Sequence, residues 1–408
     1  MTAARLALGT ASALGLARFA YGLLVPPMRD DLRWTLTEAG VVGAANGLGY
    51  LAGAAATAAV VRRWGAAAAF RGGMVVTALA LAGTAAGDVF PVLLAVRALA
   101  GASGAVVFIA GGVIAARMDG GAPLTVYFAG TGLGIVFSGV TVPALAGHWQ
   151  AAWAGLGAAA AVATLISWRA AGTGDERTAP AAGRARIRPL WRVAVAYFLF
   201  ATGYITYITF LSVYLADRHA PVGQVVLTWT VLGAAVVAAP AVWSGPITRR
   251  PGTRVLAVVL GVLAGGAAVA LLSPAVLIAS VVAYGVTFMA VPAAVTAHIR
   301  AAVAPADWTA TLSAFTALFA IGQTMGPWLA GVLADHTSAA APLAWTAVLC
   351  GAAALVTLTR NDNPKEHDHD HLRPRPRDVP RRLVFRRTDR AAPGARAPRP
   401  PGDADRGR

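Results

Sequence analysis

The chain has 408 residues, of which 57% are hydrophobic and only 13% are charged, and its formal net charge is +16. Soluble domains carry about a quarter charged residues, so water is not the solvent for most of this chain. The basic residues lie in short loops and in the last part of the chain, not along a groove with interleaved aromatics, which argues against a nucleic-acid partner.

The first half of the chain contains apolar stretches that recur between short polar breaks, each long enough to cross a bilayer as a helix. We predict six membrane-spanning helices here: Leu6–Pro27, Glu38–Val61, Phe70–Ala86, Pro91–Ala116, Pro123–Ala146 and Ala151–Trp168. The first stretch contains Arg18 and is followed by no small-residue cleavage site, so we expect it to be a retained helix and not a signal peptide.

A polar segment rich in Gly, Pro and Arg then separates the halves, as a flexible basic linker does. Six further spans follow it: Trp191–Leu215, Val222–Trp243, Val255–Leu272, Pro274–His298, Trp308–Val332 and Pro342–Leu358. We therefore expect an all-α membrane protein with twelve transmembrane helices in two six-helix bundles, residues 1–170 and 191–360. Residues 171–190 would be a cytoplasmic linker, and the basic tail, 361–408, has too few apolar residues to fold.

Arginines favour alternate loops of this predicted topology. One set contains Arg62, Arg63, Arg71, Arg117, the linker, Arg249, Arg250, Arg254, Arg300 and Arg360, and the other only Arg29, Arg33 and Arg218. Because basic loops stay in the cytoplasm, both termini should be cytoplasmic. The preference for Arg over Lys, with abundant Ala and Gly, is typical of high-GC bacterial genes and indicates a bacterial source. From the spans and the basic loops we expect a protein of the cytoplasmic (inner) membrane in contact with lipid, and nothing in the sequence requires more than a monomer.

The two halves share sequence features at corresponding places. The turn Arg62-Arg63-Trp64-Gly65 after the second span recurs as Arg249-Arg250-Pro251-Gly252 after the eighth. Phe128 and Gly139 of the fifth span likewise correspond to Phe315 and Gly326 of the eleventh. This pattern predicts parallel repeats related by an axis along the membrane normal.

Arg18 is the most informative residue, because a guanidinium near the middle of a span needs a cavity or a partner. Tyr21 lies three residues on, on the same helical face, and could form with it a pocket for a carboxylate or phosphate group. The other interpretation is structural: Arg18 would bond a neighbouring helix and hold the bundle together. Its position alone does not decide between them.

Further polar side chains lie within predicted spans and are candidates for the wall of a cavity. Asn46 and Tyr50 share a face of the second span, and Asn46 could pair with Arg18 or with substrate. The remaining candidates are Tyr204, Tyr207, Tyr127 and Gln323, each of which could instead bond a neighbouring helix.

Acidic residues are missing from the interior of the predicted spans, since Glu38 and Asp88 fall at helix ends. This weakens a proton-antiporter interpretation and leaves facilitated diffusion, anion exchange, or proton coupling through a group such as His298. The run His367–His371 in the tail lacks fixed geometry, so we expect neither a metal site nor any cofactor. Cys350, the one cysteine, excludes an internal disulfide.

Two sequence signatures resemble those of YbfB/YjiJ-type major facilitator transporters. The first is Gly15-Leu16-Ala17-Arg18-Phe19-Ala20-Tyr21 followed by Pro26 and Met28, and the second is Asn46-Gly47-Leu48-Gly49-Tyr50-Leu51-Ala52-Gly53. The resemblance extends from about Arg5 to Arg360. It implies the major facilitator fold and alternating access by rocking of the two halves around a midplane site, and it does not name the cargo.

The same resemblance suggests residues for gating. Arg97 matches the superfamily's fourth-helix arginine, and Gly130, Gly134 and Gly139 match its Gly-rich fifth helix. Arg63 and Gly65 belong to the turn after the second span, where Arg62 replaces the usual Asp and puts the superfamily's charge latch in doubt.

The leading hypothesis is therefore a carrier for a small organic solute, with an anion favoured by Arg18. An efflux pump for amphipathic compounds is the closest rival. An intramembrane serine protease using Ser103 of the Gly101-Ala102-Ser103-Gly104 run, with His298 as base, and a non-transporting receptor are the alternatives from other classes. We expect no enzyme activity.

Overall fold

The computed structural model describes residues 2–118, 122–145, 147–172 and 183–358, and in these residues the chain is helical with no β-strand. Ten of its helices are long and apolar enough to cross a membrane. One of these, α3 (Leu36–Thr84), is 49 residues long and bends at Gly65, so it supplies two spans. The apolar helix α9 (Thr253–Val269) is shorter, at 17 residues. Counted in this way, the described residues contain the twelve predicted spans.

The first half begins with α1 (Thr2–Thr10), the π-helix η1 (Ala11–Phe19) and α2 (Tyr21–Leu32), which together make one span. After α3 come α4 (Phe90–Ala116), α5 (Ala122–Thr141), the short 3-10 helix η2 (Pro143–Leu145) and α6 (Trp149–Ser167).

The second half begins with the short helix η3 (Arg188–Leu190), α7 (Trp191–Asp217) and α8 (Val222–Arg249), followed by α9. The short helix η4 (Pro274–Val276), α10 (Leu277–Phe288) and α11 (Ala290–Ala302) follow, and the half ends with η5 (Pro305–Asp307), α12 (Trp308–His336) and α13 (Ala341–Leu358).

The two predicted helices, Glu38–Val61 and Phe70–Ala86, correspond to the two parts of α3, which meet at the non-helical residue Gly65 without a loop between them. Four alanines, residues 66–69, follow the bend and favour helix, so the second span begins at once. The bend itself needs Gly65, whose φ of 80° is strained for any residue with a side chain.

Glycines let neighbouring helices approach closely. A methyl group on Gly49 of α3 would lie 1.8 Å from the carbonyl oxygen of Ala98 of α4, and one on Gly101 would lie 2.0 Å from that of Asn46. Both distances are far below any real contact, so α3 and α4 pack backbone to backbone. Small residues allow this packing where no hydrophobic effect drives helices together.

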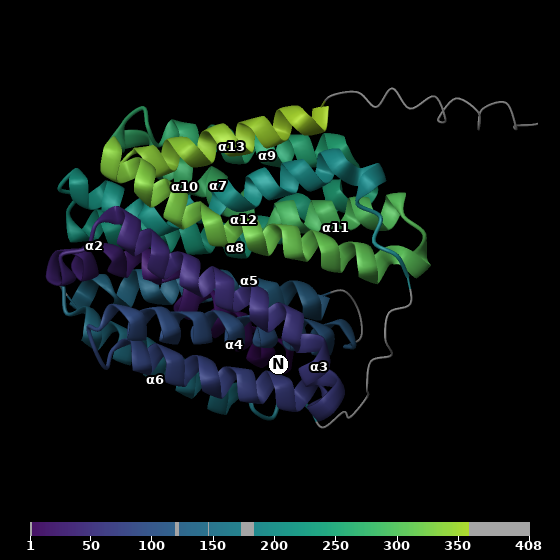
Figure 1. Ribbon diagram of the computed structural model, residues 1–408, viewed down its shortest axis with the longest axis horizontal. Helices are drawn as coiled ribbons and strands as arrows, with labels where there is room; N and C mark the ends of the chain where they lie inside the picture. The colour runs from purple at the N-terminus through teal and green to yellow at the C-terminus, as the bar shows by residue number, and fades with distance from the viewer. Residues whose placement is uncertain (1, 119–121, 146, 173–182, 359–408) are drawn as a thin grey trace, which may run out of the picture. The chain divides into compact units, whose positions relative to one another are not determined.

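Among the described residues, the two halves of the chain meet mainly along the pairs α3 with α12, α5 with α8, and α2 with α7. In Figure 1 the helices of the first half, purple to blue, gather on one side of the view and those of the second half, teal to yellow-green, on the other. At one end of the α3–α12 pair, the backbone N–H groups of Leu36 and Thr37 each donate to the Asp335 carboxylate at 2.8 Å.

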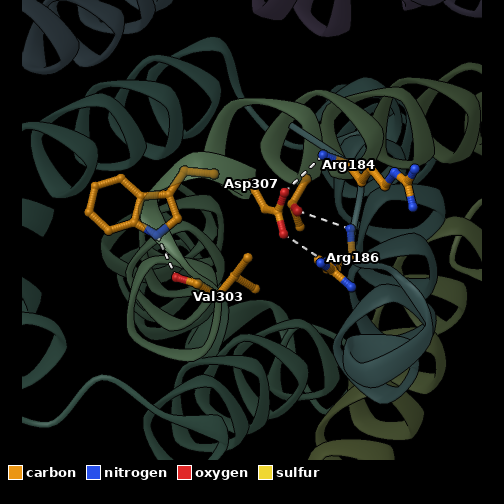
Figure 2. A network of polar contacts seen from close by, with 6 residues as sticks. Arg184, Arg186, Val303 and Asp307 are labelled. Atoms are coloured by element: carbon orange, nitrogen blue, oxygen red, sulfur yellow. Dashed lines mark hydrogen bonds and ion pairs between the residues drawn. The ribbon is translucent and has the colours of Figure 1, made fainter. Parts of the chain in front are cut away.

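The end of the linker is held at the start of α12 (Figure 2). The backbone N–H of Arg184 donates to Asp307 Oδ1 at 2.9 Å, and Arg186 Nε donates to Asp307 Oδ2 at 2.7 Å. The predicted linker interior, 173–182, and the predicted basic tail, 361–408, lie outside the described residues. The limits of the two bundles stay a prediction.

Candidate functional site

Arg18 lies in a π-helix, a feature that the sequence analysis missed. The backbone N–H of Ala20 donates to the carbonyl of Gly15 at 2.9 Å, the wider spacing of a π-turn. Gly15 is pressed against α5, where a methyl group on it would lie 2.5 Å from the Cα of Gly134. Such turns are frequent at functional sites because they redirect side chains within a helix, here the guanidinium of Arg18.

Arg18 reaches across to the second half of the chain. Its Nη2 donates to Gln323 Oε1 of α12 at 2.8 Å, and the Tyr204 hydroxyl of α7 donates to the same oxygen at 3.1 Å. The Tyr50 ring of α3 lies 5.3 Å from the guanidinium carbon, within range of a cation–π contact. Four of the predicted substrate residues, from four different spans, therefore lie together in the structure.

Two hydrogen-bond donors of this cluster have no acceptor. Arg18 is 8% exposed and Gln323 is fully buried, yet Arg18 Nε and Gln323 Nε2 have no partner among the described residues. No carboxylate pairs with Arg18 among the described residues either. A buried donor without an acceptor costs free energy, and a buried charge without a counter-charge costs more. The cluster is therefore suited to an additional anionic acceptor.

Arg97 of α4 is a second buried guanidinium, but it is held differently. It is 1% exposed, and its Nη2 donates to the carbonyl of Ala17 at 2.7 Å. The rings of Trp153 and Tyr21 lie 4.6 and 5.2 Å from its guanidinium carbon. These contacts connect α4 to the turn that carries Arg18, although Arg97 Nε and Nη1 lack acceptors among the described residues.

Tyr21 and Asn46 contact the backbone and not Arg18. The Tyr21 hydroxyl donates to the carbonyl of Ala39 at 2.7 Å, and Asn46 Nδ2 donates to the carbonyl of Arg97 at 3.1 Å. Asn46 is therefore not the hydrogen-bond partner of Arg18. Tyr21 contributes to the site through its ring, which lies against Arg97.

Tyr127 and Tyr207 are hydrogen-bonded away from the Arg18 cluster. The Tyr127 hydroxyl donates to the carbonyl of Val107 at 2.8 Å and thereby joins α5 to α4. The Tyr207 hydroxyl lies 2.6 Å from Ser280 Oγ of α10. Both residues join neighbouring helices, and a role in substrate binding stays a prediction for each.

The glycines predicted for gating are points of close helix contact. Gly130 and Gly134 of α5 abut the first span, where added methyl groups would lie 2.0 and 2.4 Å from the carbonyl oxygens of Ala7 and Ala11. Gly139 faces the second half of the chain, where a methyl group would lie 2.7 Å from the Trp229 Cβ. Whether these contacts change during transport stays a prediction.

The turn after the second span is basic and exposed. The guanidinium of Arg63 lies 6.0 Å from the ring of its neighbour Trp64, whose side chain is 58% exposed. Gly65 makes the bend of α3. An exposed Arg–Trp pair suits the interface between membrane and water, and a gating role for Arg63 and Gly65 stays a prediction.

Stacked aromatic rings lie beside the cluster, and the sequence analysis did not single them out. The Tyr204 ring stacks on those of Phe200, Phe319 and Phe288, with centroids 4.8, 5.5 and 6.1 Å apart. Phe319 lies four residues before Gln323, so helical spacing puts both on one face of α12. That spacing could have indicated the association from the sequence.

A cavity of about 460 Å³ lies between the halves, at the end where α2 and α7 finish. Its lining is mainly Leu, Val and Pro, with Asp30, Asp31 and His148 as the ionisable groups. Asp31 accepts a hydrogen bond from Trp149 Nε1 at 2.8 Å. The sequence analysis did not predict this cavity, because its walls come from stretches of both halves that lie far apart in the sequence.

Twelve helical spans with polar side chains from both halves meeting at a buried site define the class of secondary transporters. Residues 10–359 match the family described as "uncharacterised MFS-type transporter YbfB". The chain belongs to this family of major facilitator superfamily transporters, as its signatures predicted.

Solved structures share the fold at low sequence identity. A point mutant of the nucleoside transporter NupG has 13% identity and a TM-score of 0.70, over 88% of this chain and 98% of its own. The human organic anion transporter MFSD10 (TETRAN) has 16% identity and a TM-score of 0.62, over 86% and 99%. No curated protein matches the chain in sequence. The major facilitator fold is thus confirmed, with its two six-helix bundles.

Proposed function

We propose that this transporter moves a small organic anion across the cytoplasmic membrane by alternating access, and that Arg18 binds the anion. The observation that carries the proposal is the buried Arg18 guanidinium at the meeting of the two halves, whose Nε has no acceptor and which pairs with no carboxylate among the residues that the structure describes. An anion would supply both the missing acceptor and the missing charge.

The fold does not select the cargo, because one structural neighbour carries nucleosides and the other organic anions. The side chains at the site must therefore select the substrate. Arg18 and Gln323 come from opposite halves, so a ligand between them would be held by both halves at once. That position is what rocking of the halves around a fixed midplane site requires.

The proposal also includes the orientation of the protein in the membrane, its oligomeric state and its lack of enzyme activity. With basic loops kept inside, both termini lie in the cytoplasm, and the protein works as a monomer without enzyme activity. Ser103 supports this, because its hydroxyl is buried and accepts a hydrogen bond from Thr77 at 2.9 Å, in a packed setting that suits no nucleophile. Transport is facilitative or coupled to a proton, which a pH-sensitive dye inside vesicles would distinguish.

Efflux of amphipathic compounds is the second candidate, and the cavity near the end of α2 favours it. Its apolar lining with two carboxylates would suit a lipophilic cation. In that case Arg18 would be structural, paired with Gln323 to hold the halves together.

Thermal unfolding of the purified protein in detergent tests the proposal. The panel contains small carboxylates, inorganic phosphate, amino acids, sugars and lipophilic cations. A ligand at 100 times its dissociation constant should raise the free energy of unfolding by about 2.7 kcal/mol. An anion should stabilise the wild type and Arg117→Ala, which removes an exposed arginine, but not Arg18→Ala.

Stabilisation by lipophilic cations alone, unchanged in Arg18→Ala, would reject the anion carrier and favour efflux. Labelling of Ser103 by a fluorophosphonate would indicate a reactive serine and contradict the proposal that the protein has no enzyme activity. Saturable binding without accumulation in vesicles would indicate a receptor.

A further inference from the structure

The Arg18–Gln323 contact is chemically incomplete. The edge of a guanidinium that carries Nε and Nη2 offers two parallel N–H groups, which fit the two oxygens of a carboxylate. Gln323 supplies one oxygen, which accepts from Nη2, and in the described part of the chain the Nε donor is left without an acceptor. The amide nitrogen of Gln323 also has no acceptor there. One carboxylate could satisfy the orphan Nε donor and take the place of the Gln323 oxygen on Nη2.

We propose that, in the empty carrier, Gln323 Oε1 occupies the position on Arg18 that one oxygen of a carboxylate substrate takes when the substrate binds. We call Gln323 a stand-in for that oxygen. This inference rests on the proposed anion transport through Arg18. The entering carboxylate accepts from Nε and Nη2 of Arg18 and displaces Gln323 Oε1. No covalent bond changes, and the direct hydrogen bond between the halves is replaced by a substrate that Arg18 binds from one side and the rings of the second half contact from the other.

The surroundings narrow the class of substrate to monocarboxylates with an apolar or aromatic body. Arg97 Nε and Nη1 also lack acceptors among the described residues, but Arg97 is only 1% exposed and is flanked by two rings, so we assign the carboxylate to Arg18 alone, which is 8% exposed. Tyr204, whose hydroxyl donates to Gln323, stacks on the rings of Phe319 and Phe288, and these rings would contact the body of the ligand.

A stand-in has a consequence for transport. Without Gln323, Arg18 in the empty carrier would be buried with no acceptor for Nη2, which disfavours the closed state through which an empty carrier must return. With Gln323 in place the empty carrier can close. The protein should therefore perform net transport and not only exchange one substrate molecule for another.

Two substitutions at one position test the stand-in in opposite directions. Gln323→Leu removes the competing oxygen, and Gln323→Glu supplies both oxygens permanently. The probes are benzoate and phenylacetate, with acetate, succinate and inorganic phosphate for comparison, and binding to the purified full chain is measured by calorimetry and thermal shift.

Gln323→Leu should bind benzoate about tenfold more tightly than the wild type, since one hydrogen bond to a charged group no longer has to be displaced. Gln323→Glu should bind it at least about 100-fold more weakly while unfolding at a higher temperature. In proteoliposomes, Gln323→Leu should lower the ratio of net benzoate efflux to benzoate exchange. If Gln323→Leu does not fold, Tyr204→Phe releases the amide from one hydrogen bond and should tighten binding in the same direction.

The outcomes separate the two proposals. If none of the five anions binds the wild type in an Arg18-dependent way, the proposed function fails and the stand-in with it. If binding depends on Arg18 but Gln323→Leu weakens it or Gln323→Glu retains it, the stand-in alone is overturned. Tighter binding of phosphate or succinate than of benzoate would overturn the monocarboxylate class.

Discussion

At the scale of single residues, the two buried arginines differ in how they are held. Both keep donors without an acceptor among the described residues, but Arg18 bonds a side chain of the other half, whereas Arg97 is bonded to a backbone carbonyl and flanked by two rings within the first half. The contact across the halves suits a ligand site, and the enclosed position of Arg97 suits an anchor. The two residues should therefore respond differently to substitution.

Arg97→Lys should destabilise the protein. Lysine keeps the charge but cannot both donate to the Ala17 carbonyl and lie flat between the rings of Tyr21 and Trp153. We expect a loss of about 2 kcal/mol in thermal unfolding of the purified protein. Arg117→Lys, which changes an exposed arginine, is the control and should have no effect. Equal stability of Arg97→Lys and wild type would show that Arg97 is not an anchor.

At the scale of helices, packing depends on glycines that the sequence marks only by their frequency. Gly49 and Gly72 both lie on α3, yet a methyl group on Gly49 would overlap the Ala98 carbonyl and one on Gly72 would have no atom within 4 Å. Whether a glycine is required thus depends on the neighbouring helix and not on its own helix.

Gly49→Ala and Gly72→Ala should change stability in opposite directions. The first forces α3 and α4 apart and should cost about 2 to 3 kcal/mol. The second replaces an exposed helical glycine and should stabilise by up to about 1 kcal/mol. Thermal unfolding of the two variants side by side provides the measurement, and a loss of similar size in both would contradict the backbone-to-backbone packing of α3 on α4.

The contact between linker and α12 is a second prediction at this scale. Asp307→Asn removes the charge that Arg186 pairs with and one of the two acceptor oxygens (Figure 2). Limited trypsin digestion should then cleave after Arg184 and Arg186 severalfold faster, because the segment detaches more often. Cleavage after Arg117, a site far along the chain, serves as the internal control and should stay constant. An unchanged rate after Arg184 would mean that the segment is held by other contacts.

At the scale of the whole molecule, the predicted orientation can be tested with single cysteines in a Cys350→Ala background. Ser338 lies between α12 and α13 and Thr248 near the end of α8, and both are exposed. With both termini in the cytoplasm, Ser338→Cys should react with an impermeant maleimide in intact cells, and Thr248→Cys only after permeabilisation. The opposite labelling pattern would invert the topology and place the cavity between α2 and α7 on the cytoplasmic side.

The number of spans, the family and the candidate residues of the site could be predicted from the sequence, because hydropathy, loop charge and short signatures are local properties of the chain. Arg18, Tyr50, Tyr204 and Gln323 were candidates for this reason: each is a polar group in an apolar span. Only the tertiary structure decided that Gln323, and not Asn46, bonds Arg18, and that Tyr127 and Tyr207 bond elsewhere. It also decided that a π-turn carries Arg18 and that a cavity opens near the end of α2. The choice of partner for a buried polar group depends on which helices touch and at what rotation, and that is set by backbone contacts such as Gly15 against Gly134, which join residues far apart in sequence.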